Sequence, residues 1–191
     1  GAMKILGYQI GKRVYTIHRL DRPTSGVLLL GTDKGVAHQL HKALERHEFT
    51  KKYWAVVNAK PMAAEWENNS ALQKDEESTF KDAHTGFRVL QTLKCPALES
   101  DECDFLSLIE AKPHTGRFHQ IRRHLLEDNM AIVGDYRYGG VERCDRLGSK
   151  LQIGNKMLLQ AKSLDIRHPV SGELVHISAP VRPEVSRYFD C

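Results

Sequence analysis

The chain has 191 residues, and its hydrophobic and charged fractions, 41% and 27%, are those of a soluble globular protein. It contains no run of about 18 apolar residues, which excludes a transmembrane helix, and its four cysteines never approach Cys-x-x-Cys spacing, which favours reduced thiols over a zinc site. The formal net charge is +4, and because residues 65–82 hold six acidic and two basic residues, a local charge of −4, the remainder carries +8. This excess of positive charge permits a polyanionic partner such as RNA. We expect one domain spanning residues 1–191 in the cytoplasm.

The first third of the chain predicts short strands and one helix. Residues 1–3, Gly-Ala-Met, are typical of a cloning scar. Residues 14–17 alternate apolar and polar side chains like a short strand, and the apolar run at 27–30 predicts a second, fully buried strand after a connecting loop. Thr32 or Asp33 can cap a helix that begins near Lys34, carries one apolar stripe and ends around His47.

The rest of the chain predicts mainly strands. Residues 51–58 read as a central strand, residues 65–77 as a solvated acidic excursion, and residues 87–93 and 105–110 as further strands. A turn at 113–116 leads into a short helix at 119–127, and glycines at 134, 139 and 140 mark a bend. Strands at 157–166 and 174–178 are joined by a hairpin turn at 168–172. The predicted fold class is therefore α+β, a single mixed, largely antiparallel β-sheet domain with flanking helices.

Residues 18–26, His-Arg-Leu-Asp-Arg-Pro-Thr-Ser-Gly, place charged and hydrogen-bonding side chains between two predicted strands. Loops at strand ends are common positions for functional sites. Positive charge from Arg19 and Arg22 would keep Asp21 ionised and available as a nucleophile. The alternative is that Asp21 only caps the loop or forms a surface ion pair, which is the commoner role of an aspartate beside arginines.

A second basic cluster at residues 112–124 surrounds the turn that enters the second predicted helix. Its arginines and histidines are Arg117, Arg122, Arg123, His114, His119 and His124. Such a cluster suits phosphate contacts, although a solvated basic helix face has the same composition. His119 and His124 are five residues apart and do not share a helix face, so no metal pair is expected.

Lys51, Lys52 and Tyr53 combine two cations with an aromatic ring inside the predicted central strand. An aromatic ring beside cations can stack on a base while the cations hold its phosphate. Ordinary cross-strand packing is the commoner role of a strand tyrosine. This segment alone therefore does not decide between the two roles.

Taken together, these segments resemble the RluA family of pseudouridine synthases over residues 12–180. His-Arg-Leu-Asp followed by Thr-Ser-Gly resembles the catalytic motif, Lys-Lys-Tyr at 51–53 the uracil-stacking motif, and the stretch at 115–122 the motif that ends in an arginine. Residues 134–139 and 159–169 fit later blocks in the same order. Five ordered blocks are far more specific than one.

The resemblance implies a mechanism without metal or redox cofactor, because the product is an isomer of the substrate. Asp21 would be the nucleophile, Tyr53 would stack on the uracil, and Arg122 would pair with Asp21. Arg19 would fill the space left by the extruded uridine. The remaining residues expected to bind RNA are Lys52, Arg22, Arg117, His119 and Arg123.

Within the family, residues 18–26 and 121–124 are most similar to the TruC branch, which modifies tRNA. Two departures stand out: Gln160 occupies a position where histidine is usual, and the family's initial strand has no counterpart before Lys12. We expect a monomer that acts on tRNA. Three alternatives remain open: the same chemistry on rRNA, a non-catalytic RNA-binding module, and a hydrolase that uses Asp135 as a second carboxylate about 5–10 Å from Asp21.

Overall fold

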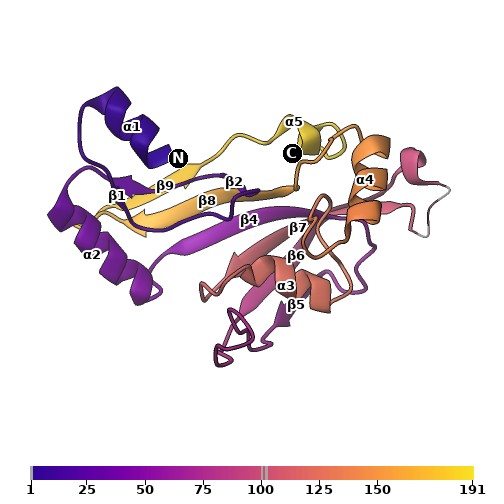
Figure 1. Ribbon diagram of the computed structural model, residues 1–191, viewed down its shortest axis with the longest axis horizontal. Coiled ribbons are helices and arrows are strands. Elements are labelled where there is room, and N and C mark those ends of the chain that lie inside the picture. The colour runs from indigo at the N-terminus through magenta and orange to yellow at the C-terminus, as the bar shows by residue number, and fades with distance from the viewer. Residues whose placement is uncertain (1, 100, 102) are drawn as a thin grey trace.

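The computed structural model describes residues 2–99, 101 and 103–191. Figure 1 shows its elements along the chain, which run in the order α1 (Ala2–Ile10), β1 (Tyr15–Thr16), β2 (Ser25–Gly26), β3 (Leu30–Gly31), α2 (Lys34–Glu45), β4 (Thr50–Val57), β5 (Glu65–Asn68), β6 (Thr85–Lys94), the 3-10 helix η1 (Pro96–Leu98), β7 (Phe105–Pro113), α3 (Gln120–Glu127), α4 (Val141–Lys150), β8 (Leu159–Arg167), β9 (Leu174–Ser178) and α5 (Pro183–Ser186).

One seven-stranded sheet dominates the molecule. Its order is β2-β8-β4-β7-β6-β5, and β9 also pairs with β8. Every pair is antiparallel except β2–β8, which is parallel. The short strands β1 and β3 form a separate antiparallel pair. The predicted α+β class with a mixed, largely antiparallel sheet is therefore confirmed.

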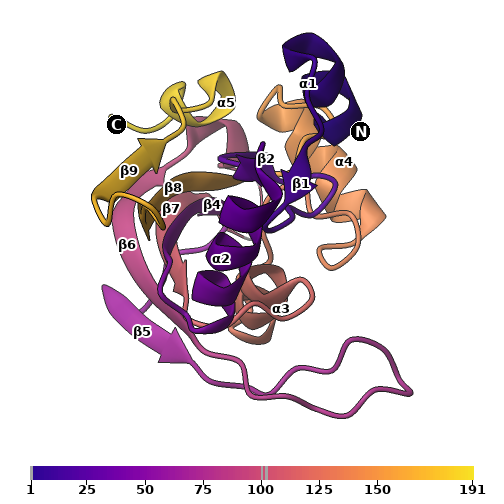
Figure 2. The same ribbon diagram turned by 90° about the vertical axis from the view of Figure 1, so that its left-hand side faces the viewer.

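Helices and loops cover both faces of the central strands. Ala55, Val57 and Ile109 pack on one face together with α3, whereas Val56 and Leu108 pack on the other face with α4 and α5. This division follows from the alternation of side chains along a strand. In Figure 2 the sheet is seen to curve around α2 and α3. The start of α3 lies close to the loop between β1 and β2, since Arg122 contacts Asp21 across the 3.3 Å between them.

Several predicted elements are confirmed. Helix α2 begins after Asp33, whose carboxylate accepts a hydrogen bond of 2.9 Å from the Val36 N–H. Strand β4 lies between β7 and β8 in the interior of the sheet. The turn at 168–172 joins β8 to β9 as an antiparallel hairpin. Among the residues that the structure describes, no helix combines the length and apolar character that crossing a bilayer requires.

Other predictions are wrong. Residues 27–30 are half-buried and do not form one buried strand, because the backbone changes partner there: Gly26 pairs with β8 and Leu30 pairs with β1. The acidic segment is not wholly an excursion, since Glu65–Asn68 forms the edge strand β5 and packs Trp66 on Phe87 at 5.1 Å between ring centroids. Helices α1 and α4 were not predicted.

Candidate active site

Asp21 lies in the loop between β1 and β2, and this loop is fixed at both ends. The Leu29 N–H donates a hydrogen bond of 2.9 Å to Nε2 of His18, and burial lowers the pKa of that imidazole. At the other end, Gly26 has φ +104° and a side chain there would lie 2.1 Å from the Ala161 carbonyl oxygen. Only glycine therefore allows β2 to pair so closely with β8.

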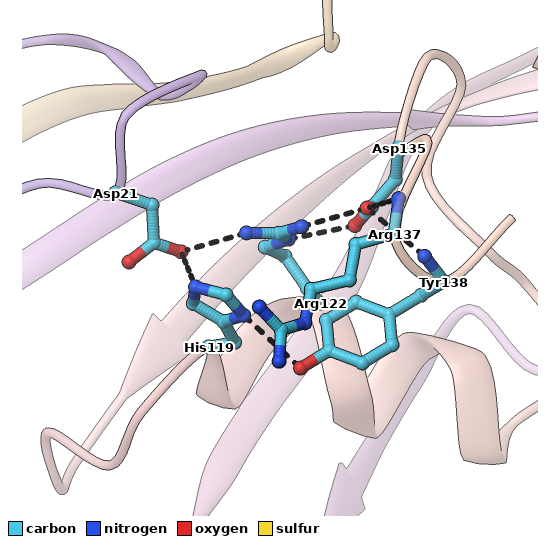
Figure 3. Close-up of polar contacts among 6 residues, drawn as sticks. All are labelled: Asp21, His119, Arg122, Asp135, Arg137 and Tyr138. Atoms are coloured by element: carbon cyan, nitrogen blue, oxygen red, sulfur yellow. Dashed lines mark hydrogen bonds and ion pairs between the residues drawn. The ribbon is translucent and has the colours of Figure 1, made fainter.

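Arg122, in the first turns of α3, binds two carboxylates at once. Its Nε and Nη2 each donate to Asp135 at 2.7 Å, and its Nη1 lies 3.3 Å from Oδ2 of Asp21. Figure 3 shows the two carboxylates on opposite sides of the guanidinium. Burial opposes the charge of Arg122, but hydrogen bonds and attraction to the two carboxylates raise its pKa above the usual value. The expected contact between Asp21 and Arg122 is confirmed.

Asp135 is almost completely buried, at 1% exposure, and its carboxylate is fully engaged. Besides accepting from Arg122, its Oδ1 accepts from the backbone N–H groups of Arg137 and Tyr138 at 3.2 and 3.3 Å. Asp135 does not line the cavity described below. A second hydrolytic carboxylate must reach a water molecule beside the substrate, and this arrangement argues against Asp135 in that role.

His119 connects Asp21 to Tyr138. Its backbone has φ +54°, a left-handed conformation that is uncommon outside glycine. Its Nε2 lies 3.8 Å from Oδ2 of Asp21, and its Nδ1 shares a hydrogen bond of 3.0 Å with the Tyr138 hydroxyl. Burial lowers the pKa of His119, although the charge of Asp21 acts in the opposite direction. The lowered pKa favours the neutral ring, and its hydrogen bond orients Tyr138 beside Arg122.

A cavity of about 600 Å³ opens in front of these groups, a size suited to a small ligand such as one nucleotide. Tyr53 and Lys51 line it from β4. Burial, followed by the negative charge of Asp21, raises the pKa of Tyr53 to about 12. Burial also lowers the pKa of Lys51. The cavity thus offers a carboxylate, a neutral phenol and a poorly solvated ammonium group.

The structure brings six of the nine predicted site residues to this cavity, namely Arg19, Asp21, Tyr53, Arg117, His119 and Arg122. The remaining three lie outside its lining. Arg22 is exposed, and Arg123 donates to the Gln73 carbonyl at 2.5 Å. Lys52 lies outside the cavity lining because successive side chains of a strand point to opposite faces. Lys51 and Tyr53 share one face of β4, so Lys51 is the lysine that lines the cavity with Tyr53.

The sequence reasoning missed the residues that support Arg122. Asp135 had been considered only as a hydrolytic carboxylate, and Tyr138, whose ring lies 5.0 Å from the Arg122 guanidinium carbon, had no expected role. The block at residues 134–139 was the available signal, since it combines an aspartate with two tyrosines and two glycines. Within the described residues, no group of three or more His, Cys, Asp or Glu side chains is arranged to hold a metal ion.

Comparison with known sequences identifies related proteins. A family model described as RNA pseudouridylate synthase matches residues 4–127. The chain is 35% identical over 187 residues to tRNA pseudouridine synthase C of Pectobacterium carotovorum subsp. carotovorum, covering 93% of this chain and 50% of that protein. It is 34% identical over 188 residues to the Yersinia pestis protein of the same name, covering 93% and 72%. The chain thus spans about half the length of the first of these relatives.

Solved structures share the fold. Human RNA pseudouridylate synthase domain containing 1 superposes with a TM-score of 0.76 at 25% identity, covering 94% of this chain and 74% of that one. Human RNA pseudouridylate synthase domain containing 4 gives a TM-score of 0.73 at 22% identity, covering 97% and 79%. The second likeness concerns the fold alone.

Proposed function

Because this chain belongs to the RNA pseudouridylate synthase family, we propose that it converts a uridine of tRNA into pseudouridine with Asp21 as the nucleophile. The observation that carries the proposal is the 3.3 Å contact between Arg122 and an Asp21 carboxylate that lines a nucleotide-sized cavity. The names of the two bacterial relatives support tRNA as the substrate. We further propose that the protein acts as a monomer in the cytoplasm.

The uridine must leave the RNA stack before Asp21 can reach it. Extrusion of a nucleotide costs a few kcal/mol in lost stacking and pairing. Arg19 is exposed and lies on the cavity wall, next but one to Asp21 in the chain. We propose that its guanidinium occupies the space that the uridine vacates in the RNA.

Asp21 then attacks either C6 of the uracil or C1′ of the ribose. The glycosidic bond breaks, the base turns, C5 bonds to C1′, and Asp21 leaves as a carboxylate. The proton on C5 is lost in the last step, so no atom is gained or lost overall once N1 is protonated. Arg122, whose Nη1 lies 3.3 Å from Oδ2 of Asp21, orients the carboxylate before attack and stabilises it when it leaves.

Tyr53 is proposed to support the uracil ring during this rotation. Because its pKa is about 12, it enters the reaction as a neutral phenol. Any part that it takes in removing the C5 proton therefore requires it to pass its own hydroxyl proton onward. Lys51, together with Arg117 in the cavity lining, is proposed to bind the phosphates of the same nucleotide.

The test is incubation of the protein with unmodified cellular tRNA and rRNA, followed by mapping of new pseudouridines and assay of free uracil. New pseudouridine in tRNA supports the proposal. Modification confined to rRNA would correct the substrate, release of uracil would identify a hydrolase, and RNA binding without either product would leave a non-catalytic module. Light scattering of the purified protein tests the monomer.

A further inference from the structure

Arg137 has a position that the proposed chemistry does not use. It lies two residues after Asp135 in the loop before α4, and its side chain is exposed. In Figure 3 this side chain points toward His119. Its charge contributes to lowering the pKa of His119, which agrees with that placement.

Two aromatic rings hold this guanidinium. Its central carbon lies 5.6 Å from the ring centroid of Phe118 and 5.8 Å from that of Tyr138. Both rings are themselves fixed, since Phe118 stacks on His119 at 3.7 Å and the Tyr138 hydroxyl bonds to the same imidazole. Cation–π contacts of this kind restrict an arginine before any ligand arrives, which reduces the entropy lost on binding.

No carboxylate in the described part of the chain forms an ion pair with Arg137, although two lie nearby. Asp135 is bound on both oxygens by Arg122, and Asp21 faces the other side of that guanidinium. Arg137 therefore presents unused donors beside Phe118, which lines the cavity. A planar guanidinium in this state is well suited to a phosphate, whose oxygens it can bind in pairs.

We propose that Arg137, held by Phe118 and Tyr138, binds the phosphodiester attached to the uridine that occupies the cavity. The inference rests on the proposed function, because it takes RNA as the ligand. A nucleotide whose base reaches Asp21 carries its phosphates at the mouth of the cavity, where Phe118 forms part of the wall and is 36% exposed. Arg137 would fix the register of the strand rather than take part in the bond changes.

The alternative is that Arg137 only packs against its aromatic neighbours. Arg13 provides a matched control, because it is exposed and its guanidinium carbon lies 5.3 Å from the Tyr15 ring, yet neither residue lines the cavity. Filter binding of wild type, Arg137→Gln and Arg13→Gln to a pool of unmodified tRNA transcripts, between 50 and 200 mM salt, separates the two roles.

Arg137→Gln should weaken binding about tenfold at low salt, as expected for a charge-assisted contact. It should also flatten the plot of log K against log salt by about 0.7 to 0.9, the value of one lost phosphate contact. Arg13→Gln should follow wild type. If Arg137→Gln and Arg13→Gln had the same affinity and the same salt slope, the proposal would be overturned.

Steady-state release of tritium from C5-labelled uridine in the same transcripts gives a second readout. KM for Arg137→Gln should rise about tenfold with kcat within about twofold, because the contact exists before and during the reaction. A fall in kcat at constant KM would instead assign Arg137 to the chemistry and overturn the phosphate role. If wild type releases no tritium but the binding defect persists, the proposed function fails while this inference stands.

Stability is checked by melting of each variant. Arg137 is exposed, so the melting temperature of Arg137→Gln should equal that of wild type. If it falls, Arg137→Lys replaces it: this variant keeps the charge and should retain the wild-type salt slope while losing part of the affinity. A wild-type affinity for both variants would contradict a guanidinium-specific phosphate contact.

Discussion

Asp135 binds Arg122 through both of its carboxylate oxygens, at 2.7 Å each, in a setting where the two side chains are 1% and 4% exposed. The contact of Arg122 with Asp21 is longer, at 3.3 Å. Arg122 is therefore positioned by a residue that does not line the cavity. In the proposed mechanism, its guanidinium can stay in place while Asp21 forms and breaks a covalent bond.

Asp135→Asn should reduce both stability and turnover. Breaking a buried ion pair by removing one partner typically costs about 3 kcal/mol or more, and Arg122 would keep only its longer contact with Asp21. Urea unfolding should show a loss of that size. Because Arg122 would also lose its orientation, kcat should fall roughly 100-fold.

The matched control for this change is Asp145→Asn. Asp145 accepts a hydrogen bond from the Tyr136 hydroxyl on the surface and does not touch Arg122. Asp145→Asn should change the free energy of unfolding by less than about 1 kcal/mol. Equal effects of the two substitutions would show that the Arg122 pair has no special role.

Asp21→Asn should abolish pseudouridine formation while RNA binding is kept or strengthened. The amide keeps the volume of the carboxylate but lacks its nucleophilic oxygen, and a negative charge facing phosphates is removed. Stability should change by no more than about 1 kcal/mol, since Asp21 is 26% exposed. Tritium release and filter binding of one transcript measure the two properties.

Asp33→Asn is the control for Asp21→Asn, because Asp33 caps α2 and does not line the cavity. It should retain turnover. Substantial turnover by Asp21→Asn, once deamidation back to aspartate has been excluded by mass spectrometry, would remove Asp21 from the mechanism and favour an RNA-binding module.

Lys51 and Lys52 offer a comparison between neighbours in sequence. Lys51 lines the cavity and burial lowers its pKa, whereas Lys52 lies outside the lining. Lys51→Gln should raise KM for tRNA about tenfold, and stability should not fall, since a poorly solvated charge is removed. Lys52→Gln should leave KM within about twofold. If tritium-release kinetics showed a larger rise in KM for Lys52→Gln than for Lys51→Gln, Lys52 would be the lysine that binds RNA, as its sequence motif predicts.

Tyr53 should make stability sensitive to alkaline pH. Its pKa is raised from 10.0 to about 12, so the folded protein holds the phenol proton more tightly than the unfolded chain. The resulting stability is present below pH 10 and is lost as the pH rises from 10 to about 12, by roughly 2 kcal/mol.

Tyr53→Phe, which has no such proton, isolates this effect. Urea unfolding of both proteins at pH 9, 10 and 11 should show a steeper loss in wild type, while the titration of the other tyrosines and the lysines cancels in the difference. Parallel pH profiles would mean that Tyr53 is not desolvated in solution.

Sequence periodicity predicted the elements whose patterns are set locally. Helix α2 has a capping aspartate and an apolar stripe, and β4 is a run of strand-forming residues, so each could be recognised alone. Residues 27–30 were misread because strand length there depends on which partner is available, and the partner changes from β8 to β1. Edge strand β5 was hidden by its exposed glutamates, Glu65 and Glu67.

For the site, motifs predicted the contact between Asp21 and Arg122, which come from segments far apart in the sequence. They did not predict the contact between Asp135 and Arg122, because the packing of a loop against a helix produces no periodic pattern in the sequence. Helix α4 did carry a usable signal, since Cys144 and Leu147 are buried three residues apart, but the flanking glycines drew attention to a bend instead.

The parallel pairing of β2 with β8 has a consequence for the order in which the protein matures. A ribosome makes the loop of Asp21 well before Gln160 and Ala161, to which Ser25 and Gly26 pair and which lie 135 residues further along the chain. Long-range pairing of this kind forms late in folding. The nascent chain therefore cannot hold the loop of Asp21 in its final place until β8 has been made, and any activity that depends on this loop should arise only after that point.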